Sequence, residues 1–266
     1  SEVMKNIVNF GAGYEMAKGL TASTNINFSK VEGTGRYGTG YSGKNVNQNF
    51  RQWYQTNVDN EEQKEAYFRT RKNITWNWQD PSTAAGLRPI YTDNFYFMRY
   101  ESFNNDERTR IFGNVALNYQ ATEWLSFLGR ISMDTYDELR EDRTGVGSVD
   151  VPGYSRANRH FQETNYDLMA NFNKDLNDDF NLQALLGTNM RRSRFESIDA
   201  STNGGLVVPG LYSISNSLNP INSPTETYNP IAVDGYFGGI TLGYRNFLTL
   251  DGTYRYDRSS TLPVEN

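Results

Sequence analysis

The sequence has no cysteine among its 266 residues, which excludes disulfide bonds and thiolate metal ligands. Its one histidine, His160, has no serine or cysteine constellation around it, which argues against a catalytic triad or a histidine-based zinc centre. No stretch approaches twenty apolar residues, and the mean hydropathy is −0.71, so a helical membrane protein is excluded. The net charge is −5 and lysine and arginine form no run, so we expect no nucleic-acid partner.

Cofactor motifs are lacking as well. Residues 33–38 match a G-x-G-x-x-G string, but a dinucleotide loop needs a buried apolar strand before it and a helix after it. Residues 38–44 imitate a phosphate-binding loop, yet Asn45 stands where a serine or threonine would bind Mg²⁺. We therefore interpret this stretch as a glycine-rich rim and expect neither a cofactor nor an enzyme.

Aromatic residues and glycine, by contrast, are abundant. The chain has 18 Tyr, 15 Phe and 23 Gly, and aromatic residues make up 14% of it. Disordered chains are poor in aromatic residues, so simple disorder does not explain the low hydropathy. A polar average with many Tyr, Phe and Gly is typical of a transmembrane β-barrel, because half of each strand faces a water-filled lumen.

Apolar and polar residues alternate in eight runs, which is the pattern of strands whose two faces meet different solvents. The runs form four hairpins and cover residues 6–16, 20–29, 110–120, 125–134, 165–173, 180–189, 236–244 and 248–256. We predict an all-β, antiparallel, up-and-down sheet of about eight strands.

The connections between these runs alternate between short and long. Turns inside the hairpins have about two to six residues, whereas the links between hairpins span roughly 33–106, 145–159 and 198–233. Outer-membrane barrels have short periplasmic turns and long extracellular loops. Aromatic residues also crowd the short turns, as an interfacial belt would require.

A soluble extracellular glycan-binding β-sandwich is the alternative, because its strands alternate too. Its strands would usually be about five or six residues long. The runs here reach about ten residues, nearer the length needed to cross a bilayer on a tilt.

Several segments resemble the SusC/RagA family of TonB-dependent transporters. They are 110–119 (RIFGNVALNY), 124–126 (WLS), 166–172 (YDLMANF), 202–209 (TNGGLVVP), 257–263 (DRSSTLP), 50–56 (FRQWYQT) and 75–78 (TWNW). The resemblance runs across nearly the whole chain and implies a 22-stranded barrel in the outer membrane of a Bacteroidetes-type bacterium. Residues 1–266 would be the middle of that barrel domain, without the plug domain and the C-terminal strands.

The resemblance also implies partners. A SusD-like surface lipoprotein would cover the extracellular loops, an oligosaccharide or oligopeptide would be the cargo, and TonB would supply energy through the missing N-terminal region. In this interpretation six side chains contact outer-membrane lipid: Val8, Phe10, Leu117, Phe127, Leu168 and Leu242.

The large first loop is where we expect binding. Aromatic residues lie there among polar ones, and their faces give a large contact area at low entropic cost. The candidate substrate or partner contacts are Trp53, Tyr54, Trp76, Trp78, Tyr91, Phe95 and Tyr96. Packing within the loop itself is the competing explanation. No metal site is assigned, and a calcium site built from loop oxygens is kept open.

Overall fold

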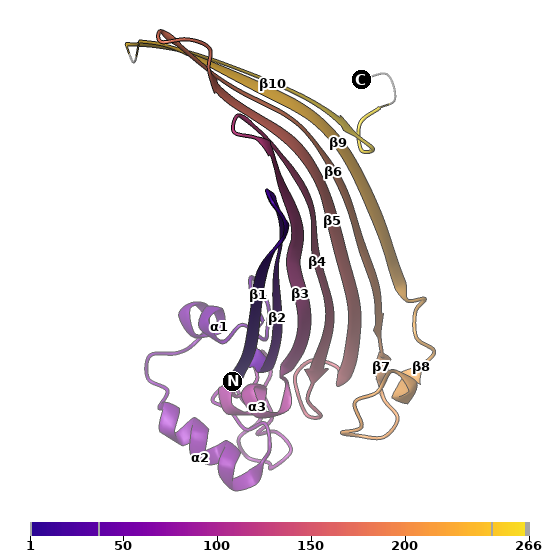
Figure 1. Ribbon diagram of the computed structural model, residues 1–266. Helices are drawn as coiled ribbons and strands as arrows, with labels where there is room; N and C mark the ends of the chain where they lie inside the picture. Colours follow the sequence, from indigo (N-terminus) through magenta and orange to yellow (C-terminus); the bar gives the residue numbers. More distant parts are fainter. Residues whose placement is uncertain (1, 37, 246, 264–266) are drawn as a thin grey trace.

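The computed structural model describes residues 2–36, 38–245 and 247–263. Its main element is one antiparallel sheet of eight strands in the order β1-β2-β3-β4-β5-β6-β9-β10, a continuous meander (Figure 1). The strands are β1 (Glu2–Ala17), β2 (Leu20–Arg36), β3 (Asn104–Thr122), β4 (Leu125–Thr144), β5 (Gly153–Asp175), β6 (Phe180–Ser201), β9 (Thr225–Tyr244) and β10 (Leu248–Ser259). Each of the eight predicted runs lies inside one of these strands, so the antiparallel up-and-down prediction is confirmed.

All the elements outside the sheet gather at one end of it (Figure 1). The link between β2 and β3 carries three helices, α1 (Val46–Gln52), α2 (Asn60–Thr70) and α3 (Phe95–Glu101). The link between β6 and β9 forms a two-stranded sheet of β7 (Asn203–Leu206) and β8 (Ser217–Asn219) with the short helix η1 (Ile214–Asn216). The tight turns lie at the opposite end. At the first of them Gly19 has a φ of 77°, and a Cβ there would come within 2.7 Å of the Gln120 carbonyl oxygen.

The strands are longer than predicted, and this corrects the predicted links. The middle link does not run from 145 to 159, because β4 ends at Thr144 and β5 begins at Gly153. The third link shrinks to residues 202–224 for the same reason. The extra strand segments are rich in polar residues and show no regular alternation in hydropathy, yet their backbones pair with neighbouring strands.

No second sheet covers the eight-stranded one within the described residues. The fully buried apolar side chains are few, and Tyr67, Phe97 and Met98 belong to the loop helices. Large apolar side chains on the strands stay exposed instead, such as Leu186 at 71% and Val8 at 62%. The sandwich alternative requires these side chains to be buried between two sheets, so that prediction is wrong for this fold. The sheet is open, with β1 and β10 as its edges.

Candidate functional site

One face of the sheet is apolar, and cross-strand register shows which residues share it. Residues directly paired across neighbouring strands point to the same face. One register row runs from Tyr14 through Ala22, Leu117, Gly129, Leu168, Thr188 and Tyr236 to Tyr256. We call the side of the sheet that carries this row the apolar face, and the opposite side the polar face.

The six predicted lipid contacts all lie on the apolar face. Leu117 and Leu168 belong to the row just described, and the other four lie on parallel rows an even number of residues away. Val8, Phe10, Leu117, Phe127 and Leu168 are exposed, whereas Leu242 is half-buried. The structure therefore places the six on one face of the sheet, and their contact with lipid stays a prediction.

The apolar band crosses the strands obliquely. In β1 the apolar residues lie on the Tyr14 row and on its loop side, from Phe10 to Val8. In β10 they begin at Tyr256, where the same row ends, and continue on its turn side from Tyr254 to Leu248. Strands in membrane barrels tilt by about 35–45° to the barrel axis, so a level lipid zone cuts their register rows at an angle.

Aromatic side chains close the turn end of this band. Trp124 packs on Phe172 with ring centroids 5.1 Å apart, and Phe180 packs on Tyr244 at 4.9 Å. Lys174 lies over the Trp124 ring, and its ammonium group is 5.2 Å from the ring centroid. The contacts link neighbouring hairpins rather than the two strands of one hairpin. Amphipathic rings with cations beside them suit a boundary between hydrocarbon and water.

The polar face carries a ladder of ion pairs that periodicity alone did not reveal. Arg110 Nε lies 2.7 Å from Asp134 Oδ1, and Arg130 Nη2 lies 2.8 Å from Asp167 Oδ2. Nearer the loops, the buried carboxylate of Glu138 accepts hydrogen bonds from two guanidinium groups, those of Arg108 and Arg140. Arginine and acidic residues that lie directly opposite each other on paired strands, or two positions from that, were the available signal. The face is hydrophilic but internally neutralised along much of its length.

The first loop is a folded layer rather than a flexible tether. Helix α3 begins with Asn94 as its N-cap, and that side chain is 1% exposed. The Asn94 amide nitrogen donates to the carbonyl oxygens of Gln63 and Ile74, at 2.8 and 2.7 Å. Its oxygen accepts from the backbone of Tyr96 at 2.8 Å. One buried asparagine therefore holds three loop segments together.

This layer is tied to the link between β4 and β5. Asp93 accepts hydrogen bonds from the Ser148 hydroxyl at 2.6 Å and the Val149 backbone N–H at 2.8 Å. The backbone N–H of Gly145 donates to the Ser102 hydroxyl at 2.8 Å. The short middle link thus acts as an anchor for the long first one.

The predicted loop aromatics fall into two groups. Tyr54 stacks on Phe95 with centroids 5.0 Å apart and meets Trp76 edge-on at 6.0 Å. Tyr96 packs on Phe68 at 6.0 Å, beside the buried Tyr67. Trp53, Trp78 and Tyr91 remain exposed, at 52%, 45% and 78%. Four of the seven candidates therefore pack within the loop. Of the seven, only Trp53, Trp78 and Tyr91 present free ring faces.

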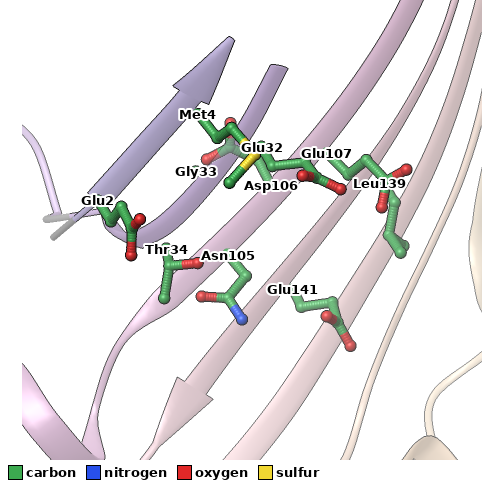
Figure 2. A pocket seen from close by; sticks show the side chains of 10 residues that line it. All are labelled: Glu2, Met4, Glu32, Gly33, Thr34, Asn105, Asp106, Glu107, Leu139 and Glu141. Carbon is green, nitrogen blue, oxygen red and sulfur yellow. The ribbon is translucent and has the colours of Figure 1, made fainter. Parts of the chain in front are cut away.

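An acidic hollow of about 290 Å³ lies on the apolar face at its loop end (Figure 2). Carboxylates of Glu2, Glu32, Glu107 and Glu141 come to it from four neighbouring strands. Lys30 is paired with two of them, at 2.7 Å from Glu32 and 3.0 Å from Glu107. The edge strand β1 forms one wall of the hollow.

Across the described ranges, no group of three or more histidine, cysteine or acidic side chains is close enough to hold a metal ion. The loop calcium site stays an untested expectation. Nor does any helix in this part of the chain have the length and apolar character to cross a bilayer.

The sequence matches no protein-family model and no curated protein. The fold, however, matches solved structures of the RagAB peptide transporter. One superposes with a TM-score of 0.69 at 13% identity, covering 98% of this chain and 29% of that chain. The RagAB peptide importer in its open-open state gives 0.71 at 14% identity, and the closed-closed state gives 0.69. The chain thus spans under a third of these proteins and shares the fold of that part.

Proposed function

We propose that this chain is a section of the wall of an outer-membrane β-barrel transporter of the SusC/RagA type. The observation that carries the proposal is the exposed apolar face of a single-layer sheet. An apolar surface this extensive is stable only against lipid or another apolar partner. The shared fold with the RagAB structures supports the same assignment.

In this proposal further strands beyond β1 and β10 complete a closed barrel of 22 strands. Closure is required because an open sheet edge in hydrocarbon leaves backbone groups unpaired, at several kcal/mol each. The polar face then lines the lumen, and the ion pairs on it neutralise a wall that cargo passes. The plug domain and the TonB-contacting segment belong to parts of the protein outside this chain.

The loop layer faces the cell exterior in this proposal, and the turn end faces the periplasm. A SusD-like lipoprotein would dock on the loops, and the cargo would be an oligopeptide or a glycan. RagAB is described as a peptide transporter, which favours an oligopeptide over a glycan in this proposal. Free ring faces at Trp53, Trp78 and Tyr91 are the surfaces on which a lid or cargo would stack.

Lipid contact is tested by placing a charge on each face in turn. Leu117→Arg puts a guanidinium on the apolar face, and Asn118→Arg puts one on the polar face of the same strand. In the complete barrel protein folded into phospholipid vesicles, we expect Leu117→Arg to lower the free energy of unfolding in urea by about 2–4 kcal/mol. Asn118→Arg should cost less than about 0.5 kcal/mol, as a water-exposed substitution does. Equal costs for both variants would contradict a lipid-facing apolar side.

Loop function is tested by separating free rings from packed ones. Tyr91→Ala removes a ring that is 78% exposed, whereas Tyr54→Ala removes one that packs on Phe95. We expect Tyr91→Ala to weaken cargo uptake or lid binding while leaving the loop resistant to protease. Tyr54→Ala should make the loop protease-sensitive. Full uptake and full lid binding in the triple variant Trp53→Ala, Trp78→Ala, Tyr91→Ala would remove these rings from the proposal.

A further inference from the structure

The apolar face carries a wide, open groove on its β5-β10 half. The groove has a volume of about 980 Å³, within the range of about 300–1,000 Å³ typical of small-molecule sites. The small residues on its floor, Ala170, Ala184, Gly238 and Gly252, alternate in register with larger side chains: Leu186 lies between Ala170 and Gly238, and Ile240 lies between Ala184 and Gly252. Larger side chains on the same face form its walls: Phe127, Leu168, Leu186, Tyr236, Ile240 and Tyr254. The groove is therefore a hollow in a surface that is otherwise covered by large side chains.

A second hollow of about 430 Å³ lies on the same face, on the loop side of the groove. Its lining is largely apolar but includes Arg192 and Arg194, for which we call it the polar hollow. On β6 the side chains of this face run from Leu186 and Thr188 in the groove to Arg192 and Arg194 in the polar hollow. Four residues separate Thr188 from Arg192, or about 13 Å of extended chain. The two hollows thus follow one another along the strands, with the polar one at the edge of the apolar band.

The polar hollow has a guanidinium surplus. Arg192 Nη1 lies 2.6 Å from Asp234, and Arg194 Nε lies 3.3 Å from Glu196. Arg258 is paired in register with Asp234 on the same face, so three arginines face two carboxylates. Arg192 Nη1 also donates to the backbone carbonyl oxygens of Arg191 and Val233, at 2.9 and 3.4 Å. A guanidinium has five N–H donors, so the contacts at Arg192 Nη1 and Arg194 Nε leave the other donors of each side chain for a ligand. The side chains of Arg192 and Arg194 are 45% and 44% exposed, so those donors are accessible.

We infer that the two hollows together form a site for one phosphate-bearing lipid, an inference that rests on the proposed lipid-facing role of this side. The phosphate lies between Arg192 and Arg194, which suit the planar, bidentate recognition of phosphate oxygens. One acyl chain lies in the groove above the Ala and Gly floor. The charge on this side is complementary to an anionic headgroup, whereas the acidic hollow on β1-β4 repels one (Figure 2).

The test uses the complete barrel protein in phosphatidylcholine vesicles, with a fluorescent label on a cysteine introduced at position 236 in the wall of the groove. Vesicles contain a minor fraction of either brominated phosphatidic acid or brominated phosphatidylcholine, which quench the label on contact. We expect brominated phosphatidic acid to be preferred over brominated phosphatidylcholine by about five-fold. One net guanidinium contact at a membrane surface strengthens binding by about that factor. The double variant Arg192→Gln, Arg194→Gln should lose that preference.

Matched variants separate this site from a general effect of charge or bulk. Arg191→Gln removes an arginine from the polar face at the same height of β6, and the preference should persist. Gly252→Leu fills the groove, where a Cβ meets only Ile240 at 3.8 Å, and should reduce the preference. Gly129→Leu, on the same face with nothing within 4 Å of a Cβ and outside the groove, should not.

The outcomes distinguish the two proposals. Equal quenching by both brominated lipids in the unmodified chain overturns the lipid site and leaves the barrel wall standing. A label at position 236 that neither lipid quenches overturns both, because the apolar face then does not contact lipid. Loss of the preference in Arg191→Gln would also overturn the site, since that side chain lies on the other face.

Discussion

At the scale of single residues, buried polar side chains organise the loop layer. Tyr67 is fully buried, and its hydroxyl donates a 2.7 Å hydrogen bond to Glu101 Oε1. Burial raises the pKa of the Tyr67 phenol above 10.0, and the hydrogen bond to Glu101 raises it further, while Arg71 opposes the shift. Only the neutral phenol can donate to Glu101, so this contact depends on the proton.

The pH dependence of the loop follows from that shift. Because the folded-state pKa is raised, the stabilisation is complete below the ordinary pKa of 10.0 and is lost as the pH rises through the folded value. We expect the protease resistance of residues 60–103 to be constant up to about pH 10 and to fall above it, measured with an alkali-stable protease. Tyr67→Phe should have a lower resistance and a flatter profile. Burial also raises the pKa of Tyr54, so Tyr54→Phe is the comparison that isolates Tyr67. An unchanged profile in Tyr67→Phe would contradict the assignment.

Roles at this scale were the hardest to predict from sequence. Asparagine is usually exposed, so nothing in the chain marks Asn94 as 1% exposed and bonded to three segments. The loop aromatics were predictable as a group, because their abundance in a polar stretch is visible. Which rings pack and which stay free depends on the path of the loop in three dimensions. The sequence therefore did not separate Tyr54 from Tyr91.

At the scale of elements, alternation of hydropathy predicted the strands wherever the two faces meet different surroundings. The alternation is lost where polar residues fall on both faces, as at Arg159 and His160 in the first half of β5, so the predicted strand begins too late. Backbone pairing continues there because each N–H and C=O finds a partner on β4 and β6. The predicted middle link was too long for this reason.

The contact between the middle link and the first loop can be tested at Gly145. A Cβ on Gly145 would lie 2.8 Å from Glu101 Cβ and 3.1 Å from Phe97 Cζ, too close for either neighbour to stay in place. We expect Gly145→Ala to cost about 1–3 kcal/mol in the stability of the loop layer, as overpacking does. Hydrogen exchange should rise in α3 but not in β4 or β5. Gly43→Ala, where the nearest atom is 3.7 Å away, is the control. Unchanged exchange in α3 would show that the two links do not depend on this contact.

At the scale of the whole molecule, the chain is a curved, two-sided sheet with a folded rim (Figure 1). Its strands have 12 to 23 residues, whereas about 9–11 tilted residues cross a bilayer. The apolar band occupies the turn-side part of the strands, and polar strand segments carry the loop layer beyond it. In the proposed barrel, this arrangement would put the loop layer outside the membrane and the neutralised polar face beneath it. The strand number and closure of a barrel could not be derived from the pattern, which predicts only the eight strands of this sheet.

The most direct test of the account is a spin-label scan along β3 and β4 of the complete barrel protein in lipid vesicles. Residues 1–266 contain no cysteine, so each label can be attached to one introduced cysteine in this part of the protein. We predict that labels at 115, 117, 127 and 131 collide mainly with oxygen dissolved in lipid. Labels at 114, 118, 130 and 132, on the polar face, should collide mainly with a water-soluble nickel chelate. If the nickel chelate reaches both sets equally, the apolar face does not contact lipid, and the proposed barrel wall is wrong.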